Sequence, residues 1–143
     1  MHMLRRRELL AYLIGAGVAG TILVVPFVLR DAVLQLFLPG RTVPLVPFFL
    51  LPVFWGSWNL LWARRQPQID IGIWGAILGF AAAVGANFYL RSQDAWFPAA
   101  LLAPAFLPVV YYLLWHLVVG PLNEALGVEG ERVRATETSH RAL

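Results

Sequence analysis

The clearest sign of architecture in this sequence is an uncharged stretch at residues 71–90, IGIWGAILGFAAAVGANFYL. Its 20 residues are about the length that an α-helix needs to cross the hydrocarbon core of a bilayer. Small residues recur at every fourth position, at Gly75, Gly79 and Ala83, and Asn87 continues the row. Such a row lets a neighbouring helix approach closely. We therefore predict a transmembrane helix against which the other helices pack.

Three further uncharged stretches have the length of a membrane span. They predict helices over about 9–29, 42–63 and 96–120. The last of these lies in a longer uncharged run, 95–123, which at about 1.5 Å per residue exceeds a hydrocarbon layer of roughly 30 Å, so this helix must tilt, bend or protrude. The predicted class is an all-α, polytopic integral membrane protein. Residues 1–127 form a four-helix transmembrane domain, and residues 128–143 form a polar cytoplasmic tail.

The composition supports this class. Of the 143 residues, 59% are hydrophobic and only 13% are charged, against about 25% charged residues in soluble domains. The absence of cysteine excludes disulfides and thiolate chemistry. The net charge of +3 comes from arginines that flank the apolar stretches, which indicates membrane topology rather than nucleic-acid binding.

The distribution of arginines predicts the orientation. With both termini inside, three arginines lie outside, at positions 30, 41 and 91. The remaining eight lie inside, at positions 5, 6, 7, 64, 65, 132, 134 and 141. This bias favours cytoplasmic termini. It suggests a bacterial cytoplasmic membrane, with an outer loop at residues 30–41. In this loop, apolar residues at 33, 34, 37 and 38 could form a short helical turn at the membrane interface.

Prolines predict irregularities in two of the helices. Pro52 lies inside the predicted span 42–63 and should bend it. Pro104 and Pro108 should bend the last span and leave carbonyl groups that a neighbouring helix must cover. Gly120-Pro121 predicts a break near the exit of that span.

Polar and aromatic residues within the spans are the candidates for a binding site, because buried polar groups are costly in a bilayer. Trp55, Asn59 and Trp62 share one helix face by their spacing. By the same spacing, Tyr112 and His116 share a face with Asn123. If the two faces meet, they form a polar-aromatic cluster in the inner leaflet.

Two interpretations of this cluster remain open. In the first, it is a ligand site, with His116 as a proton carrier or as the single axial ligand of a pigment or haem. In the second, His116 and Asn59 satisfy each other's hydrogen bonds, or His116 faces lipid headgroups. No other histidine lies in a span, so a bis-histidine haem is disfavoured. We predict no metal site and no cofactor beyond these alternatives.

Small residues indicate helix packing in two of the spans. Gly15 and Ala19 form a row in the first, and Gly75, Gly79 and Ala83 form the row described above. Asn87 extends that row and is expected to donate a hydrogen bond between helices.

Chemistry that would indicate an enzyme or an ion-coupled transporter is not apparent. No carboxylate lies inside a span, and HExxH, GxSxG and phosphate-binding glycine motifs are absent. The favoured hypothesis is therefore a non-catalytic accessory or structural subunit that assembles through the small-residue helix faces. Its partners would be the lipid bilayer and copies of itself or other membrane subunits, not nucleic acid. The alternative is a small transporter or binding protein for an apolar or aromatic ligand, and pigment or haem binding is a third.

Overall fold

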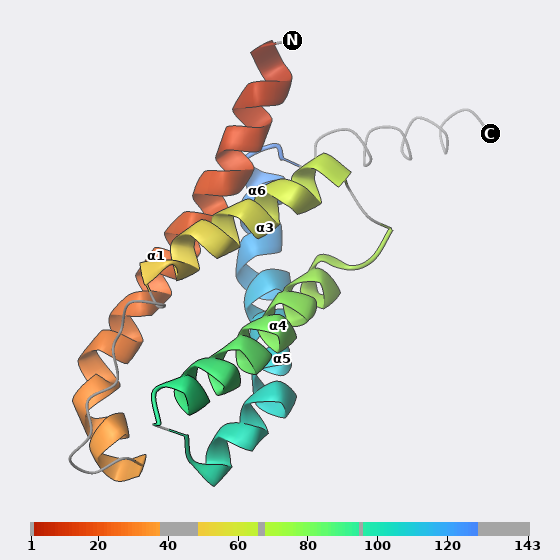
Figure 1. The fold of residues 1–143 in the computed structure, drawn as a ribbon. Coiled ribbons are helices and arrows are strands. Elements are labelled where there is room, and N and C mark those ends of the chain that lie inside the picture. The colour runs from red at the N-terminus through yellow and green to blue at the C-terminus, as the bar shows by residue number, and fades with distance from the viewer. Residues whose placement is uncertain (1, 38–48, 66–67, 95, 129–143) are drawn as a thin grey trace.

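The computed structural model of this chain describes residues 2–37, 49–65, 68–94 and 96–128. In these ranges all regular structure is helical (Figure 1). The α-helices are α1 (His2–Phe37), α3 (Leu51–Arg65), α4 (Ile71–Ser92), α5 (Ala103–Leu114) and α6 (Gly120–Ala125). A 3₁₀-helix, η1 (Pro98–Leu102), precedes α5, and a π-helix, η2 (Trp115–Val119), joins α5 to α6.

Three helical stretches are long and apolar enough to cross a membrane. They are Arg6–Val24, Ile71–Ser92 and Pro98–Ala125. The predicted span 42–63 begins outside the described residues, and its described part, α3, has 15 residues. The chain is thus an all-helical protein whose described part holds three candidate membrane spans.

Helix α1 is longer than the predicted first span. It has 36 residues and continues through Arg30 to Phe37, so the predicted loop at 30–41 is helical over its described part. Charged residues mark the end of an apolar stretch, but they are compatible with a helix interior. The prediction of a loop was therefore wrong over residues 30–37, because the helix continues beyond the end of the apolar stretch.

The helices pack as two pairs, α1 with α3 and α4 with α5 (Figure 1). The pairs are joined in part by Trp58 of α3 and Trp74 of α4, whose rings stack with centroids 4.6 Å apart. Each indole Nε1 donates to the main-chain carbonyl of the other residue, at 3.0 Å and 3.2 Å. These two hydrogen bonds set the position of α3 relative to the start of α4.

Residues 98–125 form one continuous helical rod despite their prolines. Pro104 lies in the first turn of α5, where a missing N–H costs little. Gly120-Pro121 does not end the rod, contrary to the predicted break. Instead the Gly120 N–H bonds to the Trp115 carbonyl, five residues earlier, in the π-turn. A wider turn beside Pro121 accommodates the missing N–H and the bulk of its ring without ending the helix.

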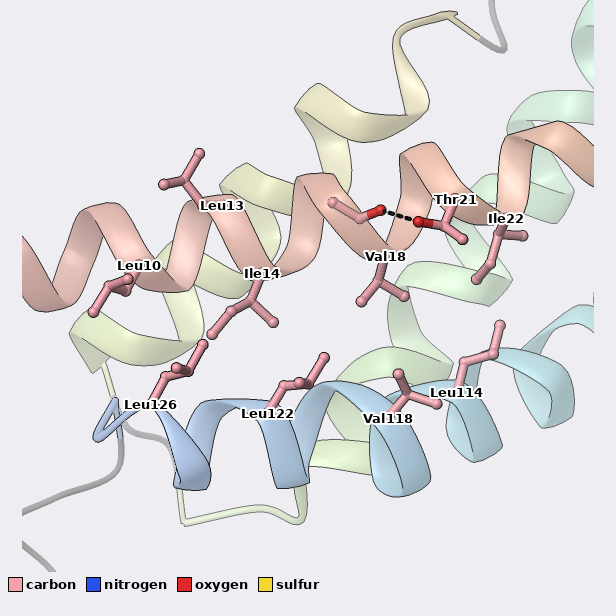
Figure 2. A pocket seen from close by; sticks show the side chains of 11 residues that line it. Leu10, Leu13, Ile14, Val18, Thr21, Ile22, Leu114, Val118, Leu122 and Leu126 are labelled. Carbon is pink, nitrogen blue, oxygen red and sulfur yellow. Dashed lines mark hydrogen bonds between the residues drawn. The ribbon is translucent and has the colours of Figure 1, made fainter.

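The start of α1 and the end of α6 lie at the same end of the molecule (Figure 1). There Glu8 of α1 and Arg64 of α3 form an ion pair with an N–O distance of 2.9 Å. The hydrogen bond to Glu8, followed by its charge, raises the pKa of Arg64. Val128, the first residue of the predicted tail, is fully buried in the same cluster as Ala11 and Ala63. An open groove lies between residues 10–22 of α1 and residues 114–126 of the last rod (Figure 2).

Candidate functional site

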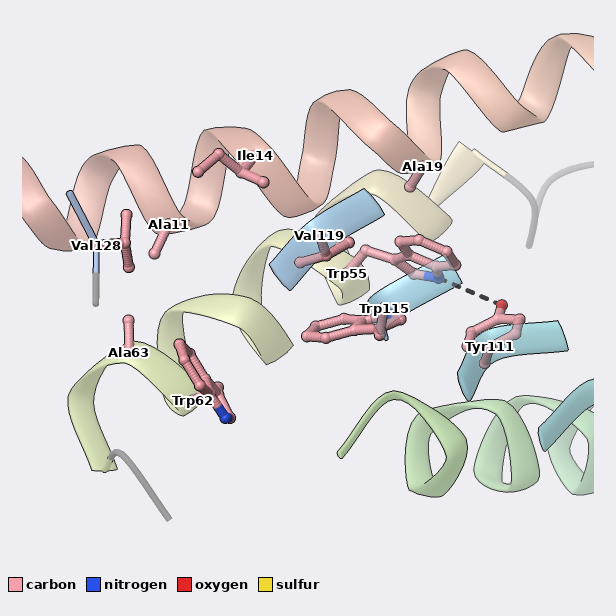
Figure 3. Close-up of a cluster of buried hydrophobic side chains, with 10 residues drawn as sticks. All are labelled: Ala11, Ile14, Ala19, Trp55, Trp62, Ala63, Tyr111, Trp115, Val119 and Val128. Atoms are coloured by element: carbon pink, nitrogen blue, oxygen red, sulfur yellow. Dashed lines mark hydrogen bonds between the residues drawn. The ribbon is translucent and has the colours of Figure 1, made fainter. Parts of the chain in front are cut away.

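The centre of the molecule is an aromatic cluster contributed by α3, α5 and η2 (Figure 3). Trp55 and Trp115 are almost fully buried, and their ring centroids are 6.0 Å apart. Tyr111 meets Trp55 edge to face at 4.9 Å, and its hydroxyl accepts a hydrogen bond from Trp55 Nε1 at 3.2 Å. The cluster therefore connects the two helix pairs through both packing and a hydrogen bond.

A pair of buried amides lies one helical turn beyond Trp55 along α3. The side chains of Asn59 and Asn123 exchange two hydrogen bonds, at 3.0 Å and 2.9 Å. Asn59 Nδ2 also donates to the Ala11 carbonyl of α1 at 2.7 Å. Both amides have no exposed surface. This arrangement links α1, α3 and α6 and uses Asn59 for helix association.

Two buried indoles have unsatisfied donors. Within the described residues, Nε1 of Trp62 and Nε1 of Trp115 have no hydrogen-bond partner. The Trp62 side chain is 8% exposed and Trp115 is fully buried. Trp62 belongs to the α3 face that the sequence predicted as a binding site, and Trp115 directly precedes His116 of the second predicted face.

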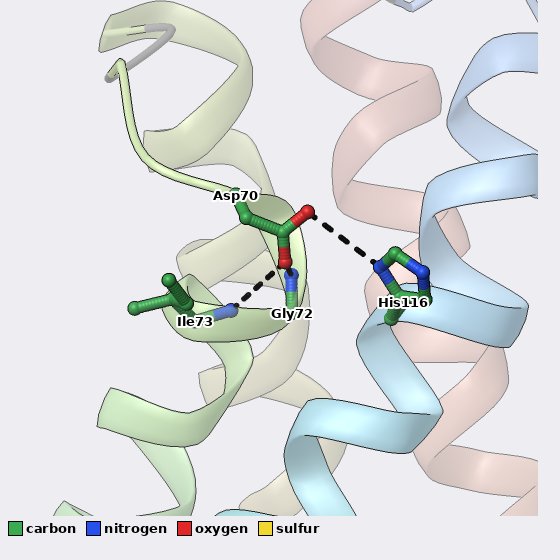
Figure 4. Close-up of polar contacts among 4 residues, drawn as sticks. All are labelled: Asp70, Gly72, Ile73 and His116. Carbon is green, nitrogen blue, oxygen red and sulfur yellow. Dashed lines mark hydrogen bonds and ion pairs between the residues drawn. The ribbon is translucent and has the colours of Figure 1, made fainter.

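The second predicted face lies elsewhere. Tyr112 and His116 stack with nearly parallel rings, 5.5 Å between centroids. The His116 side chain is about half exposed and lies beside Asp70 (Figure 4). Nδ1 of His116 is 3.6 Å from Oδ2 of Asp70, so a protonated imidazole forms an ion pair there. Asp70 also caps α4, since Oδ1 accepts the N–H groups of Gly72 at 2.8 Å and Ile73 at 3.3 Å. This polar group sits at the start of α4, at the end of a candidate span.

The structure thus brings Trp55, Asn59 and Trp62 to one buried face, but it does not bring Tyr112 and His116 to them. The face of the last rod that meets α3 carries Tyr111, Trp115 and Asn123. Asn59 bonds to Asn123 and not to His116. The cause is the π-turn. Its extra residue brings Asn123 onto the face of Tyr111 and Trp115, whereas an uninterrupted helix of 3.6 residues per turn would place Asn123 on the face of Tyr112 and His116.

The sequence contained one signal for this change of phase, Gly120-Pro121. Interpreted as a break, this pair of residues leaves the spacing of 3.6 residues per turn unchanged in the helix that precedes it. Read as a site where the helix widens, it would have moved Asn123 away from the face of Tyr112 and His116.

The rows of small residues are used inside the chain. Gly15, Ala19, Gly75, Gly79 and Ala83 are all buried. A Cβ at Gly79 would lie 2.8 Å from the Leu107 carbonyl oxygen, and one at Gly75 would overlap the Trp115 side chain. These glycines allow α5 and η2 to lie directly on α4.

Asn87 covers the start of the last rod. Its Nδ2 donates to the Ala100 carbonyl at 2.9 Å and to the Ala83 carbonyl at 3.1 Å. Its Oδ1 accepts from Trp96 Nε1 at 3.2 Å. In a regular α-helix the donor to the Ala100 carbonyl would be Pro104, which has no N–H. That carbonyl still accepts the N–H of Ala103 in the 3₁₀ turn, and Asn87 supplies a second donor from α4.

The described residues contain no group of three or more His, Cys, Asp or Glu side chains that could hold a metal ion. A comparison with protein-family models finds no matching family. Searches among curated proteins and among solved structures find no similar chain.

Proposed function

We propose that this protein is a non-catalytic integral membrane protein that serves as an accessory or structural subunit. The observation that carries the proposal is the use of the polar side chains within the candidate spans. Asn59, Asn123 and Asn87 each bond to groups of the same chain, as does Tyr111. These bonds between helices stabilise the bundle. Because these polar side chains are hydrogen-bonded within the chain, we favour a function that depends on the shape and the outer surface of the bundle.

The proposed contact surface is the outward face of α4. The sequence suggested assembly through the buried rows of small residues, but those rows already pack within the chain. On the opposite side, Ala81 and Gly85 are exposed one turn apart, and a Cβ at Gly85 would meet nothing within 4 Å. Large exposed side chains, Ile77 and Phe88, flank them. Two small residues four apart suit the close approach of a transmembrane helix from another subunit.

Native mass spectrometry of the protein, released from its own membrane in mild detergent, tests this role. We expect assemblies heavier than one chain, which either contain other membrane proteins or consist of several copies. Gly85→Leu should reduce the assembled fraction several-fold and leave the fold intact, because the added side chain points into open space.

Gly79→Leu is the matched variant for this experiment. It should lower folding stability instead, because its Cβ lies within 2.8 Å of the Leu107 carbonyl oxygen. A wild-type protein that is monomeric in its own membrane would contradict the accessory role. Normal assembly of Gly85→Leu would contradict the proposed surface.

We further propose that both termini face the cytoplasm of a bacterial cell, because eight of eleven arginines then lie inside. The chain has no cysteine, so single-cysteine variants report orientation without background. On intact cells, an impermeant maleimide should label Gln93→Cys, between α4 and η1, and should spare Gln68→Cys, between α3 and α4, until the cells are opened. The reverse pattern would invert the proposed orientation.

A further inference from the structure

The groove between α1 and the rod of α5 and α6 is a distinct feature of the surface (Figure 2). It has a volume of about 580 Å³ and is open along one side. Leu10 faces Leu126 at one end, and Ile22 faces Leu114 at the other (Figure 2). Side chains from the two helices approach across the groove without closing it, so a further molecule has room between them.

The lining selects an apolar occupant. Every lining side chain is aliphatic except Gly17, which has none, and Thr21. The Thr21 hydroxyl donates to the Gly17 carbonyl at 2.9 Å, so its proton is already used within α1. A Cβ at Gly17 would meet nothing within 4 Å, and the glycine therefore deepens the groove. The walls offer dispersion contacts and hydrophobic burial but no free donor.

The dimensions favour an extended hydrocarbon chain over a helix. From Leu10 to Ile22 the groove follows twelve residue steps, or about 18 Å of helix. This is close to the depth of one leaflet, which is about half of a 30 Å hydrocarbon core. A helix of the same length and about 10 Å diameter would occupy more than ~1,000 Å³, well beyond the volume of the groove.

A positive charge lies near the end of the groove that is lined by Leu10. Arg6 is exposed and precedes Leu10 by one helical turn on the same side of α1. It belongs to the arginine run at positions 5–7. A guanidinium binds phosphate through two parallel hydrogen bonds. An acyl chain that enters between Leu10 and Leu126 would therefore bring its phosphate to the basic start of α1.

We propose that the groove is a binding site for one glycerophospholipid. An acyl chain fills the space over Gly17, and the phosphate is held at Arg6. An anionic headgroup is preferred over a zwitterionic one, because the basic run adds attraction for net negative charge. This inference is independent of the accessory role, since a lone chain and an assembled chain both present the groove.

Native mass spectrometry with defined lipids tests the site. The full chain is reconstituted in vesicles of phosphatidylglycerol and phosphatidylcholine and is then extracted in mild detergent. We expect one retained phospholipid per chain, with phosphatidylglycerol enriched several-fold. Gly17→Leu fills the groove and should lower retention at least fivefold. Ala105→Leu enlarges an exposed side chain on α5 that does not line the groove, and this variant should retain lipid as the wild type does.

The headgroup contact has its own pair of variants. Arg6→Gln should abolish the preference for phosphatidylglycerol while a lipid is still retained. Arg65→Gln, an exposed arginine at the end of α3, should leave the preference unchanged. Equal retention by Gly17→Leu and the wild type, or equal losses in Gly17→Leu and Ala105→Leu, would overturn the proposal.

A measurement on the wild-type chain covers the case in which a groove variant does not fold. A phospholipid with a photoreactive group near its acyl terminus is retained through extraction, and its crosslinks are mapped. We expect crosslinks to residues 10–22 and 114–126. Crosslinks confined to α4 would overturn the proposal. A lipid-free dimer that Gly17→Leu converts to monomer would also overturn it, because a second copy would then occupy the groove.

Discussion

Gly15→Ala is expected to lower the free energy of unfolding by about 1–3 kcal/mol, which is the usual cost of overpacking a tight contact. A Cβ at Gly15 would lie 2.5 Å from the carbonyl oxygen of Trp55 and 3.0 Å from Cβ of Asn59. The first of these atoms belongs to the backbone of α3, so it cannot move aside as a flexible side chain can. Helices α1 and α3 would have to separate, which would also loosen the hydrogen bond from Asn59 to the Ala11 carbonyl.

The measurement is unfolding in mixed micelles of increasing SDS content, followed by tryptophan fluorescence. Gly17→Ala is the matched control, because it makes the same change two residues later, where nothing lies within 4 Å. It should be neutral or slightly stabilising, since alanine favours a helix over glycine by about 0.5–1 kcal/mol. Equal stability of the two variants would contradict the close contact between α1 and α3.

Asn59→Leu is the second change with a large expected effect. It removes two hydrogen bonds to Asn123 and one to the Ala11 carbonyl, and leaves the Asn123 amide buried without its partner. An unsatisfied buried polar group costs about 1–3 kcal/mol. Hydrogen bonds between membrane helices average nearer 0.6 kcal/mol, because the separated helices find other partners. Here both amides are fully buried, so we expect a loss of about 1–2 kcal/mol.

The double variant Asn59→Leu/Asn123→Leu provides the control. Removing both amides leaves neither unpaired, so the double variant should be more stable than the sum of the two single losses predicts. The same SDS titration measures this coupling. Strictly additive losses would mean that the two amides do not depend on each other, contrary to their reciprocal hydrogen bonds.

Residues on the last rod show where local sequence reasoning failed. Spacing by four and seven placed Tyr112, His116 and Asn123 on one face, and this arithmetic assumes 3.6 residues per turn throughout. The π-turn at Trp115–Val119 changes that value within the span. Asn123 consequently faces Asn59, while His116 faces Asp70. Asp70 was absent from the sequence-based site because it lies outside the apolar stretches.

Asn87 shows where such reasoning could succeed. Its position after Gly75, Gly79 and Ala83 placed it on the face that contacts a neighbouring helix, because one uninterrupted helix maintains the row. Its hydrogen bond to the Ala100 carbonyl lies on that face. The sequence could not identify the acceptor, because the acceptor depends on the axial position of the last rod relative to α4.

The all-helical class and the three described stretches that could span a membrane were predictable from the apolar segments alone. Apolar length and missing charge are properties of a local segment, and a bilayer selects on them directly. The tertiary structure alone decided that Trp55 meets Tyr111 and Trp115, that Asn59 pairs with Asn123, and that a groove stays open beside α1. These contacts join residues far apart in the chain. Their geometry depends on helix register and on one widened turn, and a shift of a single residue in either redirects every side chain that follows.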